Sequence, residues 1–304
     1  MLRATKYRIY PTSEQRQHLA QSFGCLRFAW NYALNLTNET YKTTGKGLGR
    51  FAIQKEITHL KKEYEWMKEP YSQCLQVVAL NLSRAFINFF EGRASYPQFK
   101  SKHRKQSISY PQNVSLVEDG IKFPKMGIVH ARLHRPIDGA IRTVTVSMNA
   151  NGQYFASVLV DDGRDIPEKT TEGKAVGIDL GLTHFAITSD GSKFDNPRWL
   201  AKHEKNLRAK QKRLSRRQKG SNNRNKTRKQ VAGVHNKISR CRSDFHHKLS
   251  RRMVDENQVI VVENLAVRNM VKNHCLESRN QSGGVGPVLY HAEVQSRARR
   301  ESLP

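Results

Sequence analysis

Hydrophobic side chains change their spacing several times along the chain, and each change predicts a different kind of element. Apolar and polar side chains alternate over part of residues 1–10, and the pattern ends at Pro11. This predicts a short strand. Within residues 12–100, two sets of apolar positions recur every three or four residues, as in helices with one buried face. Short runs with partial alternation follow in residues 105–165, separated by Gly, Pro and Asn-Gly. This order predicts a small antiparallel barrel that begins with residues 1–10 and is interrupted by a helical block.

Two local signals support this reading. Thr12 and the three residues after it offer the N-cap chemistry of a helix start. Thr143–Ser147 and Tyr154–Val158 are alternating runs joined through Asn151-Gly152, which predicts a β-hairpin.

The second half of the chain combines short apolar runs with one long basic stretch. After an acidic linker, Val176–Leu180 is typical of a buried strand, and His184–Thr188 is its expected antiparallel neighbour. A very basic stretch, residues 198–252, predicts two helices broken near Gly220. Gln258–Val262 predicts a further strand.

The charge balance indicates what kind of partner the protein binds. The chain of 304 residues has 53 Lys and Arg against 26 Asp and Glu, a formal net charge of +27. Such a surface repels itself, so a polyanion is the expected partner: nucleic acid first, an anionic membrane surface as the weaker alternative. The longest aliphatic run, Val259–Val262, is far shorter than the roughly 20 residues of a membrane-spanning helix. No signal peptide is expected either.

The cysteines bear on the cellular compartment and on metal binding. Four of them are scattered along the chain and none forms a Cys-x-x-Cys pair. We therefore expect reduced thiols in a cytoplasmic protein, with neither a disulfide framework nor a zinc site.

The basic stretch is the first candidate site. Residues 198–252 hold 20 Lys or Arg against only Glu204 and Asp244. A run of charge is usually a solvated helix face, but so many cations without acidic partners repel one another unless phosphate lies between them. The residues alone leave open whether that phosphate belongs to RNA or DNA. The candidate contacts are Lys210, Arg213, Arg216, Arg217, Arg224, Lys226, Arg228 and Lys229.

Two carboxylates form the second candidate site. Asp179 lies within a predicted apolar strand, and Glu263 follows another. A buried charge is costly unless it is paired or binds a metal, so carboxylates on neighbouring strands are suited to Mg²⁺, which assists phosphodiester cleavage. The alternative is structural, because an acid at a strand end is often solvated or caps a helix.

A series of motifs in fixed order resembles one known family. These are KYRIYPTSEQ, FGCLRFAWN, RAFINFF, SYPQFK, SISYPQ, GIDLGL, a basic run at Arg213–Ser221, DFHHKLS and VVENL. The sequence is similar, from about residue 2 to Leu276, to the TnpB (OrfB) family, the accessory transposases of small insertion sequences, which are related to type V CRISPR effectors.

The resemblance implies a multidomain α+β fold. A wedge-type antiparallel β-barrel (residues 1–10 and 105–165) would be interrupted by a helical recognition lobe (residues 11–104). A RuvC-like, RNase H-type α/β nuclease domain (residues 166–276) would follow. The implied activity is RNA-guided DNA cleavage, with a guide RNA made from the transposon end and a target DNA as partners. Asp179 and Glu263 would be RuvC carboxylates that bind Mg²⁺. The Arg213–Lys229 helices, with His247 and Lys248, would contact guide and target backbones.

The resemblance stops near residue 276. The family continues with a Trp-containing helix, a Tyr-Lys-Ala segment, two zinc-binding Cys-x-x-Cys pairs and a last Asp. Residues 277–304 contain no Cys and no Asp. With permitted codon choices, a one-base shift re-reads residues 277–300 as a segment with Trp and Tyr-Lys-Ala. We therefore expect a truncated or frameshifted member with a disordered tail, no zinc site, an incomplete Mg²⁺ site and little or no cleavage. The alternatives are a non-catalytic or repressor-like nucleic-acid binder and, against the ordered motifs, an unrelated basic RNA-binding protein.

Overall fold

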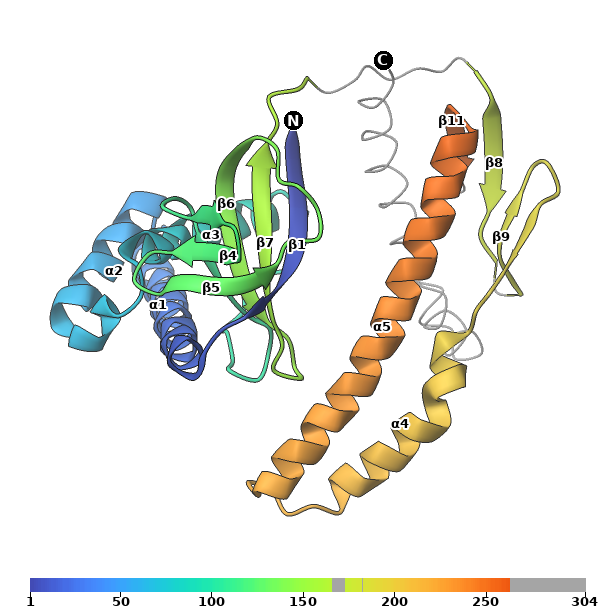
Figure 1. Ribbon diagram of the computed structural model, residues 1–304. Helices are drawn as coiled ribbons and strands as arrows, with labels where there is room; N and C mark the ends of the chain where they lie inside the picture. Colours follow the sequence, from blue (N-terminus) through green and yellow to red (C-terminus); the bar gives the residue numbers. More distant parts are fainter. Residues whose placement is uncertain (166–172, 182, 263–304) are drawn as a thin grey trace. The chain divides into compact units, whose positions relative to one another are not determined.

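The chain forms two compact units (Figure 1). The computed structural model describes residues 1–165, 173–181 and 183–262. The first unit ends at Arg164 and the second follows it. Glu263 and the segment 277–304 lie outside the described residues.

Unit 1 is built on a seven-stranded antiparallel sheet with β1 inside it. Strand β1 (Leu2–Tyr10) pairs along one edge with β7 (Tyr154–Asp161) and along the other with β5 (Gly127–Arg132). The predicted strand at residues 1–10 is therefore confirmed as part of the sheet that follows the helices. The remaining strands are β2 (Gln106–Tyr110), β3 (Ser115–Val117), β4 (Gly120–Phe123) and β6 (Ala140–Met148).

The sheet is curled but open. Its order is β2-β6-β7-β1-β5-β4-β3, and among the described residues the two outer strands do not pair with each other. The expected barrel thus has the form of a half-barrel. Strands β6 and β7 form the predicted hairpin, with Val146 opposite Ala156. At its turn, the backbone N–H of Gln153 donates to the Asn149 side chain (2.8 Å), and Gly152 adopts the positive φ of 81° that an Asn-Gly turn favours.

Helices occupy the stretch between β1 and β2. The first, α1 (Ser13–Thr44), begins with the predicted cap: the Thr12 hydroxyl accepts from the Gln15 N–H, and the Gln15 side chain accepts from the Thr12 N–H. It ends at Gly45, whose φ of 70° is left-handed. The others are α2 (Arg50–Glu63), the 3₁₀ turn η1 (Glu65–Lys68) and α3 (Ser72–Phe90).

The helices and the inner face of the sheet share one hydrophobic core. Alternation along β1 turns Tyr7 and Ile9 into this core, where both are almost fully buried. Lys6, Arg8 and Tyr10 consequently point to the opposite face of the sheet.

Unit 2 combines a small sheet with a long helical hairpin. The sheet order is β10-β9-β8-β11, in which β8 (Ala175–Asp179) pairs antiparallel with β9 (His184–Thr188) and parallel with β11 (Val259–Val262). These three strands were predicted, whereas β10 (Lys193–Asp195) was not. The hairpin consists of α4 (Trp199–Ser215) and α5 (Asn222–Glu256), and its break lies where Gly220 predicted it.

Two separate apolar clusters hold unit 2 together. Leu249 and Met253, near the end of α5, pack against Val176, Ile178 and Phe185 of the sheet. Farther along the hairpin, Leu207 of α4 packs against Val234 and Ile238 of α5.

Three of the four cysteines lie in the described residues. Cys25, Cys74 and Cys241 are free thiols. Burial raises the pKa of Cys25 to about 11 and that of Cys74 to about 12, so both remain protonated at neutral pH. Within the described part of the chain, no helix has both the length and the apolar character needed to cross a membrane.

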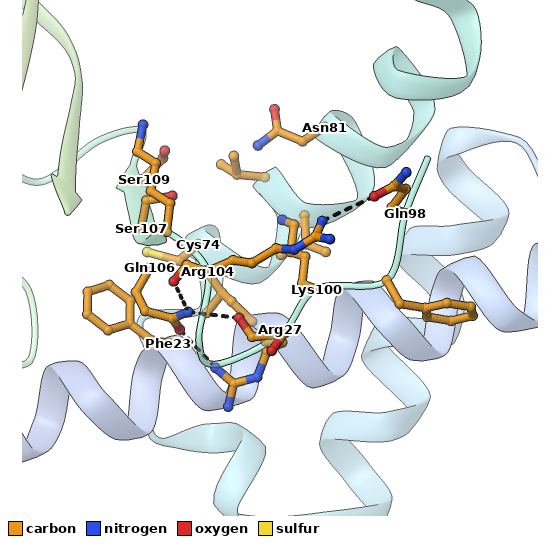
Figure 2. A pocket seen from close by; sticks show the side chains of 16 residues that line it. Phe23, Arg27, Cys74, Asn81, Gln98, Lys100, Arg104, Gln106, Ser107 and Ser109 are labelled. Carbon is orange, nitrogen blue, oxygen red and sulfur yellow. Dashed lines mark hydrogen bonds between the residues drawn. The ribbon is translucent and has the colours of Figure 1, made fainter. Parts of the chain in front are cut away.

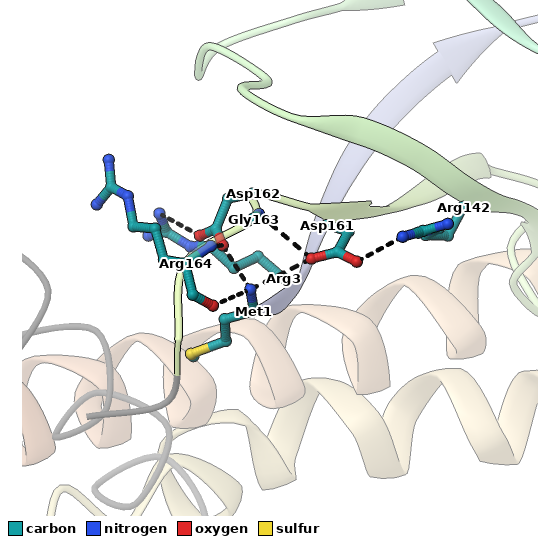
Figure 3. A network of polar contacts seen from close by, with 7 residues as sticks. All are labelled: Met1, Arg3, Arg142, Asp161, Asp162, Gly163 and Arg164. Carbon is teal, nitrogen blue, oxygen red and sulfur yellow. Dashed lines mark hydrogen bonds and ion pairs between the residues drawn. The ribbon is translucent and has the colours of Figure 1, made fainter. Parts of the chain in front are cut away.

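A polar network joins the N-terminus of the chain to the ends of strands β6 and β7 (Figure 3). The α-amino group of Met1 lies 3.2 Å from a carboxylate oxygen of Asp161 and 2.7 Å from one of Asp162. Arg142 on β6 donates to the other oxygen of Asp161 (2.7 Å). The Arg142 guanidinium and the Gly163 N–H hold the pKa of Asp161 down, at about 2. The network therefore links β6, β7 and the start of β1.

We predict that Asp161→Asn lowers the melting temperature by a few degrees at pH 7. The folded-state pKa of Asp161 is depressed, so its stabilising effect is present above the unfolded value of about 3.9 and is lost as the pH falls toward 2. Thermal melts followed by circular dichroism should show the two proteins converging over this range. Asp138→Asn, at an exposed loop position, is the control. Equal melting temperatures at pH 7 would contradict the prediction.

Candidate nuclease and nucleic-acid sites

Asp179 is the last residue of β8, and its side chain is exposed. The expectation that this carboxylate is buried within an apolar strand is therefore wrong. Alternation explains the difference, because Val176 and Ile178 take the buried positions and Asp179 falls on the other face, where the strand ends. The Asp179 carboxylate makes no hydrogen bond or ion pair with any other described residue, although the backbone of Asp179 pairs with Ile187. The carboxylate is thus available to an external ligand.

Two acids near β9 and β10, Asp190 and Asp195, interact with neighbouring side chains or backbone groups of the same strands and turn. The Asp190 carboxylate accepts from the Thr188 hydroxyl and the Ser192 N–H, and these contacts lower its pKa to about 2. Asp195 lies 3.0 Å from Nδ1 of His184. Both acids shape the turn and the edge of the sheet, which distinguishes them from Asp179.

The second predicted carboxylate, Glu263, lies outside the described residues. The last described pair between β11 and β8 is Val262 with Ile178. Across the described parts of both units, no cluster of three or more His, Cys, Asp or Glu side chains could hold a metal ion. Asp179 is therefore the one predicted carboxylate whose surroundings are defined.

The α4–α5 hairpin presents most of the predicted phosphate contacts to solvent. Arg213, Arg216 and Arg217 are exposed around the end of α4 and make no ion pair with any described residue. The few acids of the hairpin pair at i,i+4 spacing, as Glu204 does with Arg208 (2.7 Å). Lys226, Arg228, Lys229 and His247 are exposed too, and Lys210 is half-buried.

Two predicted contacts also have partners within the hairpin. Nη1 of Arg224 donates to the carbonyl oxygens of Leu214 and Arg217 (both 2.9 Å), so this guanidinium closes the turn between the helices. Lys248 lies 2.7 Å from Asp244. Arg224 and Lys248 remain predicted contacts, but each has a local structural role.

A further cationic site lies in unit 1, where the sequence pattern indicated only helix core. A pocket of about 260 Å³ opens between α1, α3 and the segment before β2 (Figure 2). Hydrophobic side chains including Phe23 and Val78 form part of its wall, and no acidic residue lines it. The cations that line it are Arg27, Lys100, Arg104 and Lys105.

Side-chain amides and an aromatic ring hold three of these cations. Arg27 donates to the Gln106 side chain (2.8 Å) and Arg104 to that of Gln98 (3.1 Å). Nζ of Lys100 lies 3.7 Å from the centre of the Trp30 ring, and burial lowers the pKa of Lys100 to about 8. These groups are spread over some eighty residues of sequence, so no local motif signals them. The pocket is suited to an anion because its cations have neutral partners.

Comparison with known proteins gives consistent matches. A family model described as "Probable transposase" (OrfB_IS605) matches residues 156–274, and one described as "Helix-turn-helix domain" (HTH_OrfB_IS605) matches residues 1–46. In the structure the latter residues hold strand β1 and the single unbroken helix α1. They do not form the two helices joined by a turn that the description names.

Two curated relatives align along most of the chain. A Streptomyces pristinaespiralis protein named "Putative RNA-guided DNA endonuclease" is 39% identical over 282 residues, which cover 89% of this chain and 69% of the relative. An Escherichia coli K12 protein of the same description, InsQ, is 32% identical over 276 residues, covering 90% and 68%. A solved structure, the cryo-EM Cas12f1-sgRNA-target DNA complex, aligns with a TM-score of 0.49 at 10% identity, covering 96% of this chain and 88% of that chain.

We predict that Arg216→Gln with Arg217→Gln weakens nucleic-acid binding by the hairpin and reduces its salt dependence. If each guanidinium contacts one phosphate, the slope of log K against log salt should become shallower by about 1.4 to 1.8. Fluorescence anisotropy over a salt series measures this slope.

The matched control is Arg251→Gln with Arg252→Gln. It removes the same charge from α5, but at positions paired with Asp255 and Glu256 (2.8 Å each). The control should change the slope less. An equal effect from both double variants would mean that only net charge matters and that the end of α4 is not a contact site.

Proposed function

The chain belongs to the OrfB family of IS605-type transposases, and from this premise we propose that it binds a guide RNA and a matching target DNA. The guide is a transcript of the transposon end. Base pairing with the guide selects the target sequence, while the protein contacts the shape and phosphates of the nucleic acids. The proposed site for cleavage chemistry is a RuvC-type carboxylate centre at Asp179 and Glu263.

The observation that carries this proposal is the setting of Asp179. Its carboxylate is exposed at the end of a central strand, has no partner among the described residues, and lies in the unit that also carries the acid-poor basic hairpin. Asp161, by contrast, pairs with Arg142. An unpaired carboxylate in the same unit as an acid-poor basic hairpin favours a role toward a metal-bound phosphodiester.

The donor chemistry at this position fits Mg²⁺, which prefers carboxylate oxygens. Asp179 and, by motif, Glu263 are the residues that would hold it. Mg²⁺ bound there would activate water and stabilise the oxygens of the phosphodiester. The part of the site that this chain supplies is anionic ligation by Asp179 and phosphate positioning by the cations of the α4–α5 hairpin.

We infer further that residues 1–304 by themselves cleave DNA weakly or not at all. Residues 264–304 contain no aspartate to act as the family's third carboxylate and no pair of closely spaced cysteines for zinc. Two carboxylates leave a two-metal site short of ligands. The second candidate function is accordingly a guide-dependent DNA binder that does not cut.

The experiment is to co-express the protein with RNA transcribed from the sequence flanking its gene, and to add matched or mismatched DNA with Mg²⁺. We expect matched DNA to be retained at least tenfold more tightly than mismatched DNA, with little or no cutting. Any residual cutting should disappear in Asp179→Asn and persist in Asp195→Asn, the matched control on strand β10 of the same sheet.

The outcomes separate the two functions. Efficient cutting that requires Asp179 would support the endonuclease and refute the inferred deficiency. Matched binding without cutting would support the non-cutting binder. Equal binding of matched and mismatched DNA, with and without RNA, would refute the proposed function.

A further inference from the structure

The outer face of the half-barrel carries aromatic rings and cations side by side. The residues involved lie on three adjacent strands, β7, β1 and β5. Four of them are exposed, and Arg8 and Phe155 are half-buried. We call this set the outer sheet face; it consists of Lys6, Arg8, Tyr10, His130, Arg132 and Phe155.

Arg8 occupies the centre of this face and lacks an acidic partner among the described residues. Its guanidinium carbon lies 5.3 Å from the centre of the Tyr10 ring and 5.4 Å from that of Phe155. Its Nε is buried, and no described residue forms a hydrogen bond with it. Aromatic rings hold this cation in place but leave this donor unsatisfied, which is a costly arrangement in the absence of an acceptor.

The partner strand adds a second guanidinium. Arg8 and Arg132 are directly opposite each other in the antiparallel pair of β1 and β5. Like charges in this relation destabilise a sheet. Strands β1 and β5 contain no acid, and the one acid of β7, Asp161, lies at the far end and is held by Arg142 and the Met1 amine. An anion between the two guanidiniums would remove this repulsion.

The rings extend along the same face. Tyr10 and His130 are cross-strand neighbours with ring centres 5.7 Å apart. Phe155 is opposite Arg8 on β7, and Nζ of Lys6 lies 4.6 Å from its ring centre. Rings alternating with cations on an open sheet are the combination that binds single strands, because bases stack on the rings while phosphates accept from the cations.

We propose that the outer sheet face binds an unpaired segment of RNA. This inference rests on the proposed function, which makes a guide RNA the partner that is bound before any target. A duplex keeps its bases stacked on one another, so it would use the cations but leave the rings without a role. The face therefore selects for unpaired bases, which RNA offers in its loops and ends. Phe155 and Tyr10 stack bases, and Arg8 and Arg132 bind the phosphate between them.

The test measures binding of an unstructured oligouridine RNA to the full chain, with and without the flanking-sequence RNA described above. Phe155→Leu keeps an apolar side chain but removes the ring, and we expect on the order of tenfold weaker binding with an unchanged salt slope. Arg8→Gln with Arg132→Gln should weaken binding and make the slope shallower by about 1.4, the value for two phosphate contacts on a single strand.

Two controls match these changes. Lys55→Gln with Lys62→Gln removes the same charge from exposed positions of α2 in the same unit. Phe155→Trp keeps a stacking ring and adds a reporter, so it should bind like the wild type and show fluorescence quenching by RNA. Phe51→Trp, on an exposed α2 side chain, should show no such quenching.

The outcomes distinguish this inference from the proposed function. One possible result is that the Phe155→Leu and arginine variants lose oligouridine binding while even the wild type fails to select matched DNA. This result would support RNA binding by the outer sheet face and refute the proposed function. If these variants bind RNA like the Lys55 and Lys62 control, and RNA does not quench the fluorescence of the Phe155→Trp variant, the inference is overturned. Equal effects on duplex DNA and unpaired RNA would overturn it as well, because the rings would then play no part.

Discussion

Pairing along both edges of β1 is the constraint on which unit 1 depends. Because β7 lies on one edge and β5 on the other, the first ten residues complete a sheet whose other strands follow some ninety residues later. The helices between them are thereby fixed over the inner face and join the same core. The pairing register also decides which side chains of β1 face the core and which face the opposite side of the sheet. A slip of one residue would expose Tyr7 and Ile9 and bury Lys6 and Arg8.

Positive charge is managed differently in different parts of the molecule. At the β1 end of the sheet, Asp161 and Asp162 neutralise the Met1 amine and Arg142. In the pocket of unit 1, amide oxygens and an aromatic ring replace acids as partners of the cations. At the end of α4 and on the outer sheet face, guanidiniums remain without acids among the described residues. Repulsion between these guanidiniums is thus uncompensated in the isolated chain. A bound polyanion would stabilise the folded state there, which is a reason to expect folding and nucleic-acid binding to be coupled.

The sequence predicted elements whose signal is local. Asn151-Gly152 located the hairpin of β6 and β7, Thr12 marked the start of α1, and Gly220 marked the break in the basic helices. Strand β10 is three residues long, too short for a periodic signal. The exposure of Asp179 depends on where β8 ends, and strand ends are poorly defined by pattern. The pocket cations and the opposition of Arg8 to Arg132 arise from tertiary pairing, which a single sequence does not reveal.

The long helix α5 packs on two separate apolar clusters of unit 2. Its first half packs against α4 through Val234 and Ile238, whereas its last turns pack against the sheet through Leu249 and Met253. His246 stacks on Phe185 in the second of these regions, with ring centres 5.5 Å apart. The strand that carries Asp179 is therefore supported by the end of α5, whereas the other cluster joins the middle of α4 to the first half of α5. The proposed nucleic-acid contacts at the tip of the hairpin and the proposed carboxylate site therefore depend on two clusters that share no core residue within the described part of the chain.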